Sequence, residues 1–348
     1  MIAQPDVLVL GAGGALAQRW MEGVLAGLAD GASLDFAAVE QTIGTSAGAI
    51  VAAGLLAGRE PARPAREPGA DGAGRGANAA TAGADPADRG ATDANHGAND
   101  ANAGADADDA EAGADVARRG RARRLLGALP AGAGKVARAA GGPLAPYALA
   151  ATRPPGALVR AGVLGRLETP TATLDELGAR IARDGLRFDG RLRIVCVERE
   201  SGRRVVFGAP GAPNATVAEA VQASCSVPWL YRPVTIEGHE YVDGGLWSPT
   251  SIDVAPAARE TRVLVLNPTG STGGDAAPHG VVRTTSRSAA ALEALTLRRR
   301  GARVTVVAPD RVAASALSGG WIGHEPDAPA EQALAAGYRQ GLALARGD

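Results

Sequence analysis

The segment Gly44-Thr45-Ser46-Ala47-Gly48 decides how this chain can fold. Val39 to Ile43, just before it, favours a short strand, whereas Ala47 to Ala57, rich in Ala and Leu and without proline, favours a helix. Glycines two positions either side of Ser46 allow a tight backbone bend that leaves Ser46 Oγ exposed at its tip. The segment therefore predicts a strand, a sharp turn and a helix, with Ser46 as a candidate nucleophile.

A simpler interpretation of the same segment is that Ser46 only caps the helix, since serine is a favoured residue at that position. A short motif with two glycines also arises by accident in a chain that contains 48 glycines. The five residues alone leave both interpretations open.

A second strand, turn and helix precede this one. Val7 to Leu10 is a continuous apolar run, Gly11-Ala12-Gly13-Gly14 follows it, and Leu16 to Ala29 has apolar residues at helical spacing. Two such units predict a parallel sheet covered by helices. The glycine loop could instead hold a phosphate at the helix N-terminus, but a dinucleotide site would need an acidic residue where the serine turn stands.

Composition narrows the class of protein. A net charge of -1 over 348 residues argues against a broad basic surface for nucleic acid. Two cysteines, Cys196 in a predicted strand and Cys225 at a predicted helix end, are too few for a disulfide scaffold and suggest free thiols. The first residues do not resemble a secretory signal, and no apolar stretch of about twenty residues occurs. We therefore expect a cytoplasmic protein whose membrane contact is at most peripheral.

Residues 59–117 differ in composition from the rest of the chain. From Glu60 to Asp115 there is no aromatic residue and no Leu, Ile, Val or Met, so the segment cannot bury enough apolar surface to offset its ordering entropy. We predict a disordered insertion within a single domain of residues 5–348. The basic segment from Arg118 to Leu129 that follows could form a helix resting on anionic lipid, or an ordinary solvated helix.

The remaining regular structure is predicted after Pro155. A capping box at Thr216 and Glu219 opens one of the helices, because each side chain can satisfy an orphan backbone N–H. Predicted helices cover Thr173 to Arg183, Thr216 to Ala223, Ser288 to Arg300 and Ala330 to Arg346; predicted strands cover Leu192 to Val197, Val205 to Phe207, Val234 to Ile236, Glu240 to Val242, Val263 to Leu266 and Val304 to Val307.

A nucleophilic serine needs a base, and no histidine stands in a supporting motif. The four histidines are His96, within the insertion, and His239, His279 and His324, in turns or loops. Tyr241-Val242-Asp243-Gly244-Gly245 instead puts a carboxylate at the end of a short strand, where glycines let another segment approach. A carboxylate within hydrogen-bond reach of a hydroxyl can act as base directly. An ordinary Asp-Gly turn is the alternative.

Taken in order, these motifs resemble those of the patatin-like phospholipase family. They are the glycine loop after the first strand, Gly44 to Gly48, the segment Ala223-Ser224-Cys225-Ser226-Val227-Pro228, and Asp243-Gly244-Gly245. The resemblance implies a three-layer α/β/α sandwich with a mainly parallel central sheet. It also implies a serine acyl hydrolase with a Ser-Asp dyad, in which Ser46 is the nucleophile and Asp243 the base.

The resemblance further implies that the enzyme cleaves lipid carboxylic esters, such as a phospholipid, lysophospholipid or acylglycerol, without a metal or cofactor. Nucleic acid is not an expected partner, and the sequence does not determine the oligomeric state. The implied oxyanion donors are the backbone N–H groups of Gly13, Gly14 and Ala47; the glycines implied to support the motifs are Gly11, Gly44, Gly48, Gly244 and Gly245.

The chain departs from the family pattern in the glycine loop, where Ala12, Leu16 and Ala17 replace two glycines and a frequently basic residue. Ser248 also stands near a position that is often asparagine. An alanine at a position that needs positive φ would strain the loop. A catalytically weak relative that binds acyl chains or a protein partner is therefore the second hypothesis.

Overall fold

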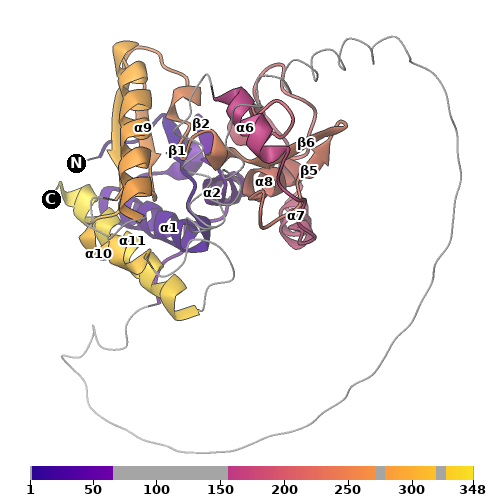
Figure 1. Cartoon of the computed structure of the whole chain (residues 1–348). Helices are drawn as coiled ribbons and strands as arrows, with labels where there is room; N and C mark the ends of the chain where they lie inside the picture. Colours follow the sequence, from indigo (N-terminus) through magenta and orange to yellow (C-terminus); the bar gives the residue numbers. More distant parts are fainter. Residues whose placement is uncertain (1, 66–155, 272–278, 319–326, 348) are drawn as a thin grey trace, which may run out of the picture. The chain divides into compact units, whose positions relative to one another are not determined.

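The described residues form one mixed sheet (Figure 1), and its core strands are buried on both faces. The computed structural model describes residues 2–65, 156–271, 279–318 and 327–347, with the side chains of 279–282 and 327 left out. Its strands are β1 (Val7–Leu10), β2 (Gln41–Thr45), β3 (Leu192–Glu198), β4 (Arg204–Phe207), β5 (Val234–Ile236), β6 (His239–Asp243), β7 (Arg262–Leu266) and β8 (Arg303–Val307).

Hydrogen-bonded neighbours follow one another along the path β5-β6-β3-β2-β1-β7-β8, and β4 pairs with β3 away from this path. The neighbours from β3 through β2, β1 and β7 to β8 are all parallel, whereas β4, β5 and β6 join by antiparallel pairing. The parallel core places the carboxyl ends of β1, β2 and β7 at one edge, which is where ligands bind in open α/β sheets.

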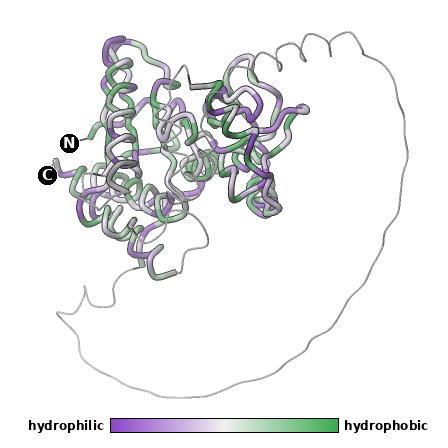
Figure 2. The backbone as a smooth tube through the Cα atoms, viewed as in Figure 1, coloured by the Kyte–Doolittle hydropathy of each residue, from purple (hydrophilic) through white to green (hydrophobic). Residues whose placement is uncertain are grey.

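Alternating residues of β1 send side chains into two separate apolar clusters. Leu8 and Leu10 join a cluster with buried residues of α1, α2 and α8, whereas Val7 and Val9 join one with α9. The sheet therefore lies between two helical layers, and the predicted three-layer α/β/α sandwich is confirmed. Along α9 hydrophobic and hydrophilic residues are interspersed (Figure 2), consistent with one buried and one solvated side. The helices are α1 (Gly14–Ala32), α2 (Ala47–Leu56), α6 (Ala157–Leu164), α7 (Asp175–Ala182), α8 (Val217–Cys225), α9 (His279–Arg299), α10 (Arg311–Ala316) and α11 (Asp327–Arg346), with 3-10 turns η1 (Phe36–Ala38), η4 (Gly244–Leu246) and η5 (Ile252–Val254).

Most predicted elements are present with small shifts at their ends. The predicted strand from Val39 to Ile43 is shifted, because β2 pairs with β1 over Gln41 to Gly44 while a 3-10 turn lies just before it. The helix predicted to start at Ser288 begins at His279. Its first turns are rich in polar and β-branched residues, whose low helix propensity hid them. The capping box at Thr216 forms as predicted.

Two short helices were missed by the sequence analysis. The eight residues of α6 place Leu164 against Val197 and Val242 of the sheet, a contact that periodicity over so short a stretch cannot reveal. The six residues of α10 are capped by Asp310, whose Oδ1 accepts from Ala313 N at 2.8 Å. Both helices depend on tertiary packing or a cap more than on propensity.

The predicted insertion at residues 59–117 falls mostly outside the described residues, and so does the basic segment from Arg118 to Leu129. The described strands on either side of this stretch, β2 and β3, are direct neighbours in the sheet. The helices in the described ranges lack a stretch long and apolar enough to span a lipid bilayer.

Candidate active site

Ser46 occupies a strained turn between β2 and α2. Its φ of 54° and ψ of -121° lie in a region that favours glycine, and such strain in a non-glycine residue is typical of functional positions. Its side chain makes no capping hydrogen bond to α2. Ser46 is therefore the N-cap residue of α2 by position, but its hydroxyl group does not cap the helix.

The glycines flanking Ser46 are required by close backbone contacts. A Cβ added to Gly44 would lie 2.5 Å from Ala49 Cα, and one added to Gly48 would lie 2.1 Å from Leu10 O. The turn therefore contacts the last residue of β1 at Gly48 and the first turn of α2 at Gly44. This packing, rather than a positive φ, explains why both positions are glycine.

Gly48→Ala is expected to lower the free energy of unfolding by about 1–3 kcal/mol, because the new methyl group overlaps the Leu10 carbonyl. Gly54→Ala in the same helix is the matched control, since its Cβ would meet only the Arg59 side chain at 3.4 Å. That control should stabilise by roughly 0.5–1 kcal/mol through helix propensity. Urea unfolding of both variants measures the difference, and equal stabilities would contradict the packing argument.

Strand β3 brings distant parts of the chain together. Its residues 194–197 pair with β4 along one edge. Its residues 192–195 pair with β2, and its residues 196–198 pair with β6. Strand β4 occupies one edge of β3 at residues 194–197, and both β2 and β6 also pair with part of this range. They must therefore pair with the other edge of β3, where they lie end to end.

The two strands meet at their carboxyl ends. Thr45, the last residue of β2, is opposite Val195, and Asp243, the last residue of β6, is opposite Cys196. Ser46 follows Thr45 directly, so the junction of the two strands brings its side chain to Asp243. A Cβ on Gly244 would lie 2.2 Å from Val195 O, so this junction also needs glycine after the aspartate.

The Ser46 side chain lies close enough to Asp243 for its hydroxyl group to lower the pKa of that carboxyl group. The two residues are 8% and 3% exposed, so the pair is largely shielded from water. Burial raises the pKa of Asp243 from 3.8 to about 6, against the opposing effects of the Ser46 hydroxyl and of Gly245 N–H, which donates to Asp243 Oδ1 at 2.6 Å. A carboxyl group with such a pKa is ionised at neutral pH and is still basic enough to accept a proton.

The glycine loop follows β1 and is held by backbone hydrogen bonds. Gly11 N–H donates to Leu266 O at 3.0 Å and Ala12 N–H donates to Pro249 O at 2.7 Å. The expectation that alanine at position 12 strains the loop is wrong, because the positive φ of 77° falls on Gly14 and Ala12 has none. The substitution at position 12 therefore leaves the loop conformation available.

The three predicted oxyanion donors lie at two helix N-termini. Gly13 caps α1 and Gly14 is its first residue, while Ala47 is the first residue of α2. N–H groups at the start of a helix have no intrahelical acceptor and favour negative charge. Gly13 has no room for a side chain, because a Cβ there would lie 2.5 Å from that of Ala17. Leu16 and Ala17 are themselves buried in the core.

Ser224 belongs to the motif Ala223 to Pro228, but the sequence predicted no role for it. In the structure Ser224 Oγ accepts from Ser46 N–H at 2.8 Å and donates to Val195 O at 2.7 Å. This hydroxyl thus ties the serine turn to β3 at the point where β6 begins to pair. Only its place in the ordered motifs could have marked it.

The histidines do not contribute a base among the described side chains. His239 lies on β6, more than half exposed, with Nδ1 3.1 Å from Glu198 Oε1. The His279 side chain and all of His96 and His324 lie outside what the structure describes. Cys196 and Cys225 are free. In the described part of the chain, no three His, Cys, Asp or Glu residues gather in a way that could hold a metal ion.

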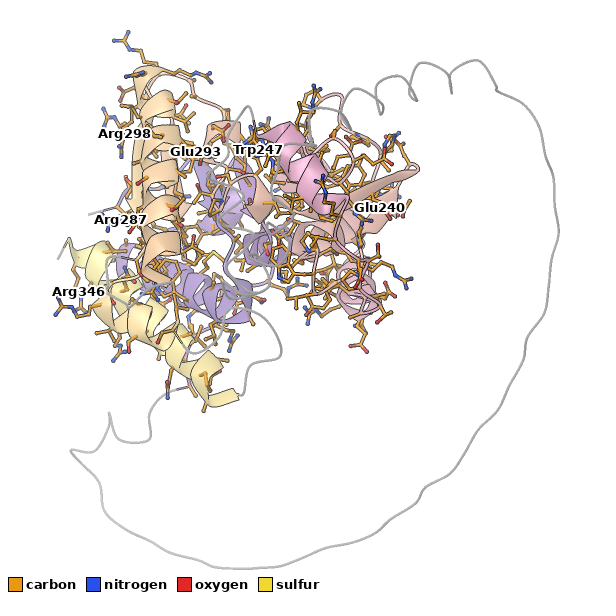
Figure 3. The ribbon with its side chains drawn as sticks, in the orientation of Figure 1. Glu240, Trp247, Arg287, Glu293, Arg298 and Arg346 are labelled. Atoms are coloured by element: carbon orange, nitrogen blue, oxygen red, sulfur yellow. The ribbon has the colours of Figure 1, made fainter. Side chains whose placement is uncertain are left out.

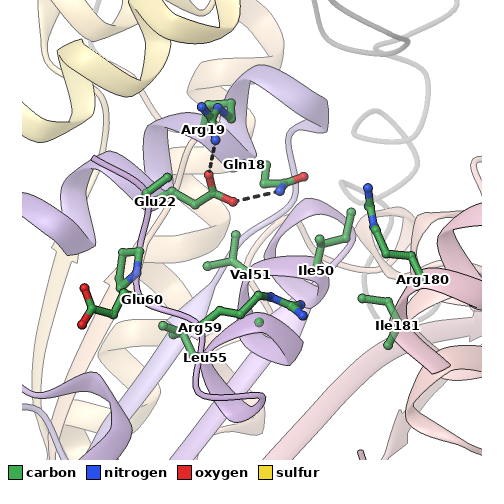
Figure 4. A pocket seen from close by; sticks show the side chains of 13 residues that line it. Gln18, Arg19, Glu22, Ile50, Val51, Leu55, Arg59, Glu60, Arg180 and Ile181 are labelled. Carbon is green, nitrogen blue, oxygen red and sulfur yellow. Dashed lines mark hydrogen bonds and ion pairs between the residues drawn. The ribbon is translucent and has the colours of Figure 1, made fainter. Parts of the chain in front are cut away.

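A pocket of about 300 Å³ lies beside α2, the helix that starts after Ser46 (Figure 4). Apolar side chains of α2 and Ile181 of α7 line it together with Arg19, Arg59 and Arg180. Neither Ser46 nor Asp243 is among its lining residues, so this pocket is separate from the site that these two residues form.

Comparisons with known proteins give one strong match. The family model of the patatin-like phospholipases matches residues 8–256, which include every motif named above. No match is found among curated protein sequences.

Two solved structures have a distant likeness to this chain. One is VipD from Legionella pneumophila, with 16% identity and a TM-score of 0.41; the match covers 99% of this chain and 67% of VipD. The other is the type III effector protein ExoU, with 13% identity and a TM-score of 0.33; the match covers 99% of this chain and 53% of ExoU. These similarities are too low to support an argument about function. Because the family model covers most of this chain, the chain belongs to the patatin-like phospholipase family of lipid hydrolases.

Proposed function

We propose that this protein is a serine acyl hydrolase that cleaves lipid carboxylic esters through an acyl-enzyme on Ser46, with Asp243 as the base. The meeting of β2 and β6 on β3, which brings the Ser46 hydroxyl beside the buried Asp243 carboxylate, is the observation that carries the proposal. It provides a proton acceptor within reach of the nucleophile, which is the first requirement of base-assisted attack.

In the first half of the reaction, Ser46 Oγ attacks the ester carbonyl carbon and its proton passes to Asp243. The tetrahedral intermediate then collapses, and the leaving alkoxide takes that proton and departs as alcohol or lysolipid. In the second half, a water molecule gives a proton to Asp243 and attacks the acyl-enzyme. The fatty acid leaves, and Ser46 recovers its proton from Asp243.

The negative charge on the carbonyl oxygen needs donors in place before the reaction. We propose the N–H groups of Gly13, Gly14 and Ala47 for this role, because they open two helices whose N-termini favour negative charge. Lipid esters are proposed as substrates on the basis of the family alone. The candidates within this class are phospholipids, lysophospholipids and acylglycerols.

A second candidate function is binding of acyl chains or a protein partner with little catalysis. The departures at Leu16 and Ala17 favour it, since both side chains are buried in the core where the family pattern has a basic residue and a glycine. The two candidates differ in one property: only the hydrolase needs an activated serine.

Fluorophosphonate labelling over a range of pH tests the proposal. Labelling should occur at Ser46, and its rate should fall about tenfold per pH unit below pH 6, because protonated Asp243 can no longer accept the serine proton. Above about pH 7 the rate should be level. Protein unfolded in urea is the control, as its serines have no base. Absent labelling in the folded protein, or a rate independent of pH, would support the binding function.

A further inference from the structure

The buried carboxyl group of Glu293 lies at the centre of a hydrogen-bonded turn that the dyad mechanism does not use. Glu293 is on α9 and only 3% exposed. It lies on the side of α9 that faces the sheet, opposite the exposed Arg298 (Figure 3). A buried carboxylate is costly unless its acceptor sites are filled, so its partners indicate its role.

Three donors converge on this carboxylate from one turn. Ser248 Oγ donates to Glu293 Oε1 at 2.7 Å, and Thr250 Oγ1 donates to Glu293 Oε2 at 2.7 Å. The N–H of Ile252 also donates to Oε2, at 2.9 Å. An ionised carboxylate accepts all three bonds, whereas a glutamine has one oxygen and must present an amide donor at the other position.

The turn itself would not hold this shape unaided. Ser251 has a φ of 51°, a strained value for a residue other than glycine. Its N–H donates to Ser248 Oγ at 2.9 Å, so the hydroxyl that binds Glu293 also closes the turn. Ser248, Thr250 and Ser251 are all fully buried, and water cannot replace these contacts.

The turn of residues 248–252 is hydrogen-bonded to the glycine loop. Pro249, in its middle, accepts the Ala12 N–H at 2.7 Å. A Cβ on Gly11 would lie 3.0 Å from the same carbonyl oxygen, so the turn and the loop are in tight contact. The residues that follow Ala12 are Gly13 and Gly14, the proposed oxyanion donors.

We propose that Glu293 is a positioning residue. It fixes the positions of the oxyanion donors through the turn of residues 248–252 and the hydrogen bond from Ala12 N–H to Pro249 O. This inference rests on the proposed hydrolase function. It assigns to α9, which contributes nothing to the dyad, a role in the reaction. It also gives Ser248, a departure from the family pattern, a defined partner.

The test compares Glu293→Ala and Glu293→Gln with Leu297→Ala. Leu297 is fully buried on the same helix one turn later, and no hydrogen bond joins it to the turn, so its variant controls for loss of α9 packing. Hydrogen exchange of the peptide covering Leu8 to Gln18 reports the Ala12 amide without any need for activity. Hydrolysis is measured per fluorophosphonate-titrated site, so that unfolded molecules are not counted.

For Glu293→Ala we expect roughly tenfold or faster exchange at Ala12 and a kcat about 10–100-fold lower with little change in KM, because misplaced oxyanion donors act on the transition state. Glu293→Gln can still accept from Thr250 and Ile252 while its amide NH2 faces Ser248 Oγ, so its loss of kcat should be smaller than that of Glu293→Ala. The pH at which the rate falls should stay near 6 in both variants, since Asp243 is untouched. Leu297→Ala should lower the melting temperature while retaining kcat per site.

Two outcomes would overturn the inference. Unchanged Ala12 exchange in Glu293→Ala would remove the structural link whether or not the protein is an enzyme. An equal loss of kcat per site in Leu297→Ala would show that packing of α9 alone is responsible. If Ala12 exchange rises but the wild-type protein has no Ser46-dependent hydrolysis, the proposed function fails, and the catalytic role of Glu293 fails with it.

Discussion

Replacing Ser46 with alanine should lower kcat for a fluorogenic lipid ester by about 10⁴-fold or more, because loss of the nucleophile removes the acyl-enzyme route entirely. What remains is the catalysis that oxyanion donors and binding provide to direct attack by water. The measurement is steady-state hydrolysis of micellar or vesicle-bound ester at pH 8.

The positive φ of Ser46 makes alanine at this position strained, so Ser46→Ala could lose activity by unfolding. Ser46→Gly settles this point, since glycine adopts the same backbone conformation without strain and also lacks the hydroxyl. We expect it to be inactive with a melting temperature at least as high as that of the wild type.

Ser226→Ala is the matched control for these variants. Ser226 is also buried and lies beside Asp243, whose N–H donates to its carbonyl, but its own hydroxyl donates to Gln222 O. This variant should keep most of the wild-type rate. Wild-type hydrolysis in Ser46→Gly would exclude Ser46 as nucleophile.

Asp243→Asn should lower kcat by about 10⁴-fold and at the same time stabilise the fold at pH 8. The amide has the shape of the carboxyl group and can still accept from Gly245 N–H, but it cannot take the serine proton. Gain of stability with loss of activity is the expected sign of a residue whose charge is kept for function.

The direction of the pH effect follows from the pKa of Asp243. Its folded-state value of about 6 exceeds the unfolded value of 3.8, so the folded protein binds this proton more tightly. The ionised group therefore costs up to about 3 kcal/mol of folding free energy above pH 6, and this cost disappears as the pH falls toward 3.8. Chemical denaturation of both proteins between pH 4 and 8 measures it.

The stability advantage of Asp243→Asn should thus grow as the pH rises from 4 to 8. Asp189→Asn is a suitable control, because Asp189 is a surface carboxylate whose pKa is lowered beside Arg191. Its replacement should give no gain at high pH. A destabilised Asp243→Asn at pH 8 would contradict the view that Asp243 is an energetically costly buried anion.

Sequence patterns determined the local elements that form the site. Apolar runs ending in glycine predicted β1 and its loop, and the pentapeptide around Ser46 predicted the serine turn, because both depend on residues that are neighbours in the chain. The ordered motifs also indicated the family, which the match over residues 8–256 confirmed. Element ends and the short helices α6 and α10 were less predictable, since they depend on contacts with distant segments.

Other features of the site depended on the tertiary structure alone. Ser46 and Asp243 are joined because β2 and β6 share one edge of β3, a pairing register that local patterns do not encode. The family pattern likewise predicted strain at Ala12, whereas the positive φ of the loop lies at Gly14. The hydrogen bonds that Glu293 accepts from the turn of residues 248–252 could not be predicted for the same reason. By itself the sequence determined which residues could do the chemistry; strand pairing and burial decided which of them meet, because hydrogen bonds and desolvation arise only between groups that the fold has brought together.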